Sequence, residues 1–194
     1  MSEIGWNFDN TYAHLPEILL SHVSPQTSTS PELIVFNEPL SRDLGLDFSN
    51  IDRASLSQIF SGNVLVQGSN AISQAYAGHQ FGFFTVLGDG RAILLGEHLN
   101  KENIRYDIQL KGSGKTPYSR SGDGRAALGP VLREYLISES MHKLGVPTTR
   151  GLAVVTSGDS VYREKEHPGA IFTRVASSHL RVGTYQFALL KGGA

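Results

Sequence analysis

The sequence predicts an α+β fold in which a twisted antiparallel sheet carries one packed helix. Short segments of alternating polar and apolar residues recur along the chain, and one pronounced helical stripe stands among them. Ten of the 21 glycines lie between residues 78 and 129, so turns shape the backbone there. With 194 residues and 40% hydrophobic content, the chain can bury one good core.

Residues 1–65 are expected to form an arm that is partly irregular and partly helical. Three prolines in the first 31 residues disfavour long elements there. The remaining patterns predict short helices at about 15–22, 37–45 and 52–60, and one strand at 33–36. Gly45 and Gly62 would end the second and third of these helices.

Residues 66–194 are expected to hold most of the sheet. The alternation predicts strands at 71–76, 83–87, 91–97, 107–111, 152–156, 161–164 and 170–176. Residues 88–90, with two glycines, would form a tight hairpin turn between the second and third strands, and residues 157–159 a turn between the fifth and sixth. A last helix is expected over 178–190, capped by Ser177.

The main helix is expected from about residue 128 to Gly145. Its apolar stripe follows the helical period over Leu128, Val131, Leu132, Tyr135 and Leu136. Pro130 in the first turn and Gly145 at the end are typical of helix boundaries. Glu139 falls inside the stripe and Glu134 on its flank, so either acid could reach a lysine on a neighbouring strand. An inward carboxylate without a partner would be destabilising.

A glycine-rich basic loop separates the strand at 107–111 from this helix. Between Lys101 and Arg133 the chain has seven basic and three acidic residues, so this window carries a charge of +4 in a chain whose net charge is −1. Lys111 would stand at the end of its strand, next to the loop. Because glycines let backbone amides approach a ligand and the side chains supply positive charge, the window predicts an anion site that suits phosphate.

Two familiar phosphate motifs are absent from the sequence. A P-loop requires a glycine five residues before Gly114, and that position is Gln109. A dinucleotide fingerprint requires a third glycine after Gly88 and Gly90, and residues 91–93 lack it. The phosphate site predicted here is therefore of another kind.

Composition excludes several classes of protein. The chain has no cysteine, so it cannot form a disulfide framework or use a cysteine nucleophile. No apolar run approaches the roughly 20 residues of a membrane span, and no signal or transit pattern opens the chain, so we expect a cytoplasmic protein. The seven histidines show no metal-ligand spacing, so no metal site is predicted within this sequence.

Together the predicted elements have the plan of the small lobe of a protein kinase. That plan combines a twisted antiparallel sheet, a packed helix, a glycine turn and a strand lysine that pairs with a helix glutamate. No segment resembles the catalytic loop or the metal-binding aspartate motif of a kinase large lobe. We therefore expect an arm at 1–65, a kinase-like nucleotide-binding lobe at 66–194, and no catalytic C-terminal lobe in this chain.

Five segments closely resemble the SelO family, also called YdiU: residues 75–82, 87–97, 107–120, 122–135 and 147–150. Residues 8–16 are similar to the opening of that family too, so the resemblance covers essentially the whole chain. It implies a pseudokinase that binds ATP in an inverted pose, transfers AMP to Ser, Thr or Tyr hydroxyls of proteins and releases pyrophosphate. A related UMP transfer is ascribed to bacterial members.

The resemblance also implies roles for particular residues. It assigns ATP contacts to Gly88, Gly90, Arg91, Lys111, Asp123, Gly124, Arg174 and Arg181. It pairs Lys111 with Glu134, whereas the helical wheel alone favours Glu139. The catalytic base and the ligands for Mg²⁺ or Mn²⁺ are expected beyond residue 194. We therefore expect this chain alone to be inactive or nearly so, with a C-terminal lobe outside it as a partner.

Other functions stay open at this stage. The chain could be a non-catalytic module that binds ATP or a partner, and Lys111 could be a solvated strand-end lysine and Asp123 a turn former. Nucleic-acid binding is the weakest alternative, because few aromatic residues accompany the basic window and the net charge is negative. A membrane partner is not expected.

Overall fold

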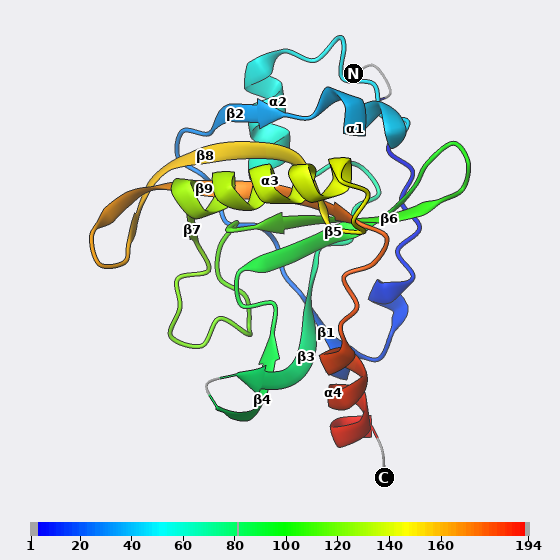
Figure 1. Cartoon of the computed structure of the whole chain (residues 1–194), viewed down its shortest axis with the longest axis vertical. Coiled ribbons are helices and arrows are strands. Elements are labelled where there is room, and N and C mark those ends of the chain that lie inside the picture. The colour runs from blue at the N-terminus through cyan, green and yellow to red at the C-terminus, as the bar shows by residue number, and fades with distance from the viewer. Residues whose placement is uncertain (1–3, 81, 193–194) are drawn as a thin grey trace.

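The structure is a computed structural model that describes residues 4–80 and 82–192. One antiparallel sheet organises this part of the chain (Figure 1). Its strands are β1 (Leu20–His22), β2 (Glu32–Phe36), β3 (Ile72–Gln80), β4 (Phe83–Gly88), β5 (Ala92–Leu99), β6 (Arg105–Lys111), β7 (Ala126–Ala127), β8 (Arg150–Tyr162) and β9 (Glu166–Ala176). The described helices are α1 (Glu38–Asp43), α2 (Arg53–Ser61), α3 (Leu128–Lys143) and α4 (Val182–Gly192). The predicted α+β class is confirmed, and the kinase-like assignment stays a prediction.

The sheet runs in the order β1-β3-β5-β6-β9-β8-β2, with β4 paired to β3 and β7 to β9. Strands β1 and β2 come from the first 65 residues, yet both pair with strands from the later part of the chain. Strands β6 and β9 lie at the centre, and both carry residues of the predicted site. The domain boundary at residue 65 is untested and stays a prediction.

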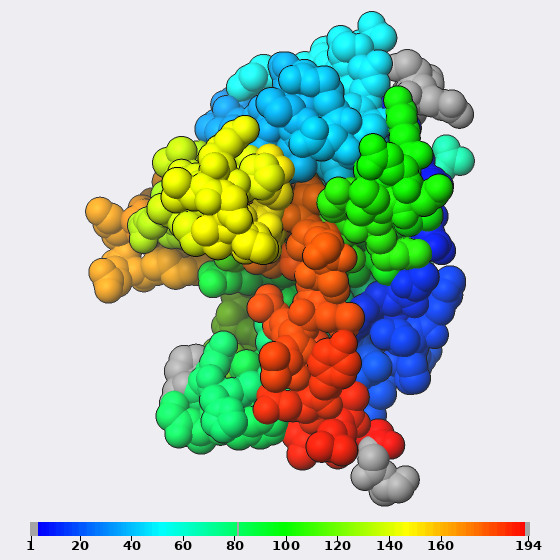
Figure 2. All heavy atoms as spheres, turned by 45° about the vertical axis from the view of Figure 1, so that its right-hand side comes forward, coloured from blue at the N-terminus to red at the C-terminus, as the bar shows by residue number. Residues whose placement is uncertain are grey.

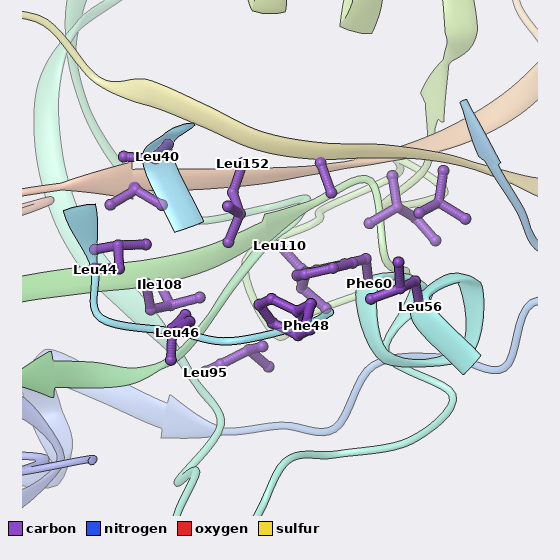
Figure 3. Close-up of a cluster of buried hydrophobic side chains, with 14 of the residues drawn as sticks. Leu40, Leu44, Leu46, Phe48, Leu56, Phe60, Leu95, Ile108, Leu110 and Leu152 are labelled. Atoms are coloured by element: carbon purple, nitrogen blue, oxygen red, sulfur yellow. The ribbon is translucent and has the colours of Figure 1, made fainter. Parts of the chain in front are cut away.

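Helices cover both faces of the sheet near β8 and β9. Helices α1 and α2, with the segment 44–48, pack against one face in the main hydrophobic cluster (Figure 3). Helix α3 packs on the other face, where Val131 meets Val154 and Phe172. Burying each of these large side chains contributes about 1.5–3 kcal/mol relative to leaving it exposed, so both faces hold the central strands in place.

Local sequence explains where three of the helices begin or end. The side chain of Asn37 accepts a hydrogen bond from the backbone of Leu40 and caps α1, and Asp52 caps α2 by accepting from Ser55. Gly62 ends α2 in the left-handed conformation, as its sequence position predicted. Gly145, with φ of 77°, follows the last turn of α3.

Several predicted elements are wrong in detail. Residues 88–90 do not join β4 and β5 as a hairpin, because β4 pairs with β3, from Ala75 opposite Gly88 to Gln80 opposite Phe83, and β5 also pairs with β3. The backbone N–H of Asp89 donates to the carbonyl of Gln74 at 2.9 Å, so the chain continues along β3 beyond Gly88. A local glycine pattern marks a turn but does not choose the strand that pairs.

The other differences concern elements that local patterns misplaced. Residues 157–159 lie inside β8, where the register shifts between Thr156 and Ser160, so β8 and β9 form one long hairpin rather than three strands. Residues 15–22 form a short 3-10 turn and then β1 instead of a helix. Helix α4 begins at Val182, later than a cap at Ser177 predicted. Leu136 is 62% exposed and therefore does not belong to the buried stripe of α3.

Candidate functional site

A pocket of about 740 Å³ opens between the sheet, the loop at 112–125 and the hairpin of β8 and β9. It is lined by all eight residues that the sequence predicted to contact ATP: Gly88, Gly90, Arg91, Lys111, Asp123, Gly124, Arg174 and Arg181. Seven of the lining side chains are Lys or Arg and two are Asp, so the pocket favours an anionic ligand. Whether these residues bind ATP stays a prediction.

Two cations of the pocket form a cluster with one carboxylate that lies beside it. Lys111 ends β6, Arg174 lies on the neighbouring β9, and Glu134 lies in the second turn of α3 above them. One carboxylate oxygen of Glu134 accepts a hydrogen bond from Lys111 Nζ, and the other lies 3.3 Å from Arg174 Nη1. Glu134 therefore bridges two cations that come from adjacent strands.

Glu139, which the helical wheel favoured as the partner of Lys111, pairs with Arg150 instead. Its carboxylate accepts from Arg150 Nε at 2.8 Å and Arg150 Nη2 at 2.9 Å, and also from the backbone N–H of Gly151 and the side-chain amide of Asn37. Three of these hydrogen bonds fix the C-terminal half of α3 to the start of β8, and the fourth joins it to the cap of α1. Glu139 has no contact with Lys111 among those the structure describes.

Burial and mutual charge set the protonation of the cluster. Burial lowers the pKa of Lys111, and the nearby Arg174 lowers it further against the pull of Glu134. Burial works to raise the pKa of Glu134, but Lys111 and Arg174 outweigh it, so that pKa is lowered. With both cations charged and Glu134 ionised, the cluster keeps one uncompensated positive charge that a phosphate group can neutralise.

Two residues that sequence reasoning missed extend the cluster. Gln109 accepts a hydrogen bond from Arg174 Nη2 and donates from Nε2 to Asp89 Oδ2 at 3.2 Å. Both are buried, Gln109 fully and Asp89 to 4% exposure. Burial raises the pKa of Asp89, and the neighbouring Arg174 and Arg181 work against this. The period of the strand could have revealed Gln109, because it lies two residues before Lys111 and so on the same face of β6.

The remaining cations approach from the edges of the pocket. The guanidinium of Arg181 lies 4.9 Å from the centre of the Tyr76 ring, which is a cation–π contact. Within residues 4–80 and 82–192, the Arg91 side chain makes no hydrogen bond or ion pair. Asp123 faces Arg163 at 2.7 and 3.0 Å and also accepts from the backbone N–H of Arg125, so its carboxylate already holds its own loop together.

The site glycines serve close packing inside the protein. A Cβ atom on Gly88 would lie 2.4 Å from Tyr118 Cγ, and one on Gly90 would lie 2.8 Å from the Tyr118 carbonyl. Gly124 has φ of 69°, and a Cβ there would meet the Gly114 carbonyl at 2.0 Å. These glycines let the loop at 112–125 lie directly against the end of β4, and this contact closes one wall of the pocket.

The described residues contain no group of three or more His, Asp or Glu placed to hold a metal ion. The two pocket carboxylates are held by Gln109 and Arg163, so they do not form a ready set of metal ligands. Of the helices that the structure describes, none is long and apolar enough to cross a membrane.

Comparison with known proteins gives a consistent result. The family model described as "Protein adenylyltransferase SelO" matches residues 3–191. A "Protein nucleotidyltransferase YdiU" of Pelagibacter ubique is 61% identical over 188 residues, which are 97% of this chain and 39% of the relative. A protein of the same description from Shouchella clausii is 58% identical over 187 residues, 96% of this chain and 38% of the relative. The chain thus spans about two fifths of the length of these relatives.

Proposed function

The chain belongs to the SelO family of protein adenylyltransferases, and from this premise we propose that it forms the ATP-binding part of an enzyme that transfers AMP to protein hydroxyls. The reaction would modify Ser, Thr or Tyr side chains and release pyrophosphate. The observation that carries the proposal is the pocket, because the eight residues that the family resemblance assigns to ATP line one cationic cavity.

The position of the cations suggests how the nucleotide lies. Lys111 and Arg174 share the carboxylate of Glu134 at the deep end of the pocket, and Arg181 lies near Asp89 beside them. The terminal phosphates of ATP carry most of its charge, so they would occupy this end. The α-phosphorus would then face the mouth, where a protein hydroxyl can approach.

The chemistry follows from that orientation. The hydroxyl oxygen bonds to the α-phosphorus, the bond from the α-phosphorus to the pyrophosphate oxygen breaks, and the electron pair leaves with pyrophosphate. Lys111, Arg174 and Arg181 would stabilise the charge that develops on this leaving group. The hydroxyl proton would pass to a base that we expect outside this chain. A divalent cation held by residues outside this chain would supply further charge neutralisation.

The test is ATP binding by the purified chain, measured by calorimetry beside Lys111→Ala and Arg174→Ala. Each variant should weaken binding about tenfold or more, because each removes a charge-assisted hydrogen bond worth about 1.5–3 kcal/mol. Lys115→Ala is the matched control, since Lys115 is exposed and lies outside the pocket lining. Equal binding by all four proteins would refute the proposal, and so would the absence of binding by the unmodified chain.

A non-catalytic module that binds ATP or a partner is the second candidate. Helix α4 packs beside β3, and its outer side lies at the surface (Figure 2). Val182, Tyr185 and Leu189 are 79%, 68% and 74% exposed, which is typical of an interaction surface. Concentration-dependent self-association that Leu189→Glu abolishes would favour this candidate. Competition between ATP and UTP in the calorimetric assay would show which of the two nucleotides the pocket prefers.

A further inference from the structure

A chain of polar side chains, buried at one end and half-buried at the other, runs along the cationic end of the pocket. It passes from Glu134 to Arg174 at 3.3 Å, from Arg174 to Gln109, and from Gln109 to Asp89 at 3.2 Å. The family resemblance assigns a role to Arg174 and Glu134 but none to Gln109 or Asp89. Since both are almost fully buried beside a ligand cavity, their presence requires an explanation.

The backbone fixes the positions of three of these four residues. Gln109 and Arg174 are directly opposite each other in the pairing of β6 with β9. Asp89 is held through its N–H, which donates to the Gln74 carbonyl at 2.9 Å, and through its carbonyl, which accepts from Thr116 Oγ1 at 2.7 Å. The side chains therefore meet at positions that the sheet has already fixed.

Each hydrogen bond of this chain has one possible donor and one possible acceptor. A guanidinium can only donate, so the carbonyl oxygen of Gln109 must face Arg174. The amide nitrogen of Gln109 then faces Asp89, which as a carboxylate can only accept. If the amide turned over, its NH₂ would meet the guanidinium and its oxygen would meet the carboxylate, and both contacts would be repulsive. Arg174 on one side and the Asp89 carboxylate on the other thus select the same orientation of the Gln109 amide.

The hydrogen bonds between Asp89 and Gln109 and between Gln109 and Arg174 in turn hold Arg174 in position. Its side chain is 13% exposed, one terminal nitrogen contacts Glu134 and the other contacts Gln109. Two anchors on the two ends of a planar fork fix the plane of that fork. Its Nε is buried without a hydrogen-bond partner in the described structure, so no third contact holds the side chain.

We propose that Asp89 and Gln109 are positioning residues that orient the Arg174 guanidinium for the terminal phosphates of the nucleotide. This inference rests on the proposed function. If the Arg174 guanidinium loses this orientation, ATP binding should weaken more than AMP binding, because AMP lacks the two phosphates that would lie beside Lys111 and Arg174. Burial raises the pKa of Asp89, so its ionised carboxylate lowers the stability of the fold. A carboxylate with that cost is consistent with a role in ligand binding.

Asp89→Asn separates this role from two simpler ones. A purely electrostatic role predicts tighter ATP binding, because the variant removes a negative charge from a pocket that binds an anion. A purely structural role predicts that binding and thermal stability fall together. The positioning role predicts about tenfold weaker ATP binding with unchanged or higher thermal stability. An amide of the same shape then replaces a buried carboxylate, but it can turn either its oxygen or its NH₂ toward Gln109 and so holds that amide less firmly.

The experiment measures ATP and AMP binding by calorimetry and the melting temperature of the unmodified chain, Asp89→Asn and Glu97→Gln. Glu97 is a matched control, because it is a buried carboxylate of the same sheet outside the pocket. Glu97→Gln should lower the melting temperature and leave the ratio of ATP to AMP affinity unchanged. Equal or tighter ATP binding by Asp89→Asn would overturn the proposal.

A second readout works without any nucleotide. In the ligand-free chain, the side-chain NH₂ signals of Gln109 and the Nε–H signal of Arg174 in nitrogen-15 NMR spectra should shift or broaden in Asp89→Asn. Unchanged signals would refute the claim that Asp89 orients Gln109 and Arg174, even if ATP binding fell. If the unmodified chain bound no ATP, the proposed function would fail for this chain, and the spectra would still decide whether Asp89 orients Gln109 and Arg174.

Discussion

Because Lys111 and Arg174 share the carboxylate of Glu134, we can predict which of two substitutions destabilises the fold more. Glu134→Gln would leave Lys111 and Arg174 close together without the anion that both contact. Lys111→Met would remove one cation and leave the ion pair of Arg174 with Glu134 intact. The glutamate substitution should therefore destabilise the fold more than the lysine substitution, although each removes one charge.

The magnitude follows from the burial of the three side chains. Removing one partner of a fully buried ion pair costs about 3–5 kcal/mol. The side chains of Glu134, Lys111 and Arg174 are 31%, 20% and 13% exposed, so water solvates part of the orphaned charge. We expect Glu134→Gln to lower the free energy of unfolding by about 2 kcal/mol and Lys111→Met by about 1 kcal/mol. With Lys111 already replaced, Glu134→Gln should cost less than it does alone.

Urea unfolding of the two single variants and the double variant, followed by the fluorescence of the only tryptophan, Trp6, gives these values. The dependence of the free energy of unfolding on pH provides a second test. Since the folded state lowers the pKa of Glu134, its contribution is present above about pH 4.5 and is lost as the pH falls through the lowered value. Glu134→Gln should lack that part of the acid sensitivity. A larger loss for Lys111→Met, or additive effects in the double variant, would refute the shared-carboxylate reasoning.

Three further predictions concern other parts of the fold. Gly88→Ala should destabilise by about 2–4 kcal/mol, measured by urea unfolding, because its φ of +154° and the contact of a Cβ with the neighbouring loop both oppose a side chain. Stability should fall as the pH drops below about 6.5, measured by melting temperature, because burial lowers the pKa of His98 and the unfolded chain therefore takes up the proton first. Glu139→Gln should cost about 1–3 kcal/mol in urea unfolding, since it disrupts the paired hydrogen bonds to Arg150.

Each of these predictions has a control within the chain. Gly129→Ala adds the same methyl group where no atom lies within 4 Å, and in helix α3 it should stabilise by up to about 1 kcal/mol. If Gly88→Ala were as stable as Gly129→Ala, the packing argument would be wrong. His98→Gln should flatten the pH profile above pH 5.5 or so, and a profile as steep as before would assign the effect to another group. Ser140→Ala, on the exposed face of α3, should leave stability nearly unchanged, and a Glu139→Gln effect no larger than this would contradict the third prediction.

The sequence by itself determined the local features of this protein. The alternation at 107–111 and the helical stripe after residue 128 predicted β6 and α3, because period and capping act within a few residues. The cationic glycine-rich window predicted where an anion site would lie, and the pocket formed there. The family motifs predicted the family whose model matches residues 3–191.

Only the tertiary structure decided which distant groups meet. Strand β4 pairs with β3 rather than β5, and the glycines beside it do not encode that choice. Periodicity favoured Glu139 as the partner of Lys111, whereas the family resemblance implied Glu134; in the structure Lys111 contacts Glu134, and Glu139 pairs with Arg150. The contact of Gln109 with Asp89 joins a residue of β6 to one in the turn after β4, and no period within either segment encodes it. Local periodicity fixes the face on which a side chain lies, whereas its partner is fixed by strand order, register and the need to satisfy buried charge.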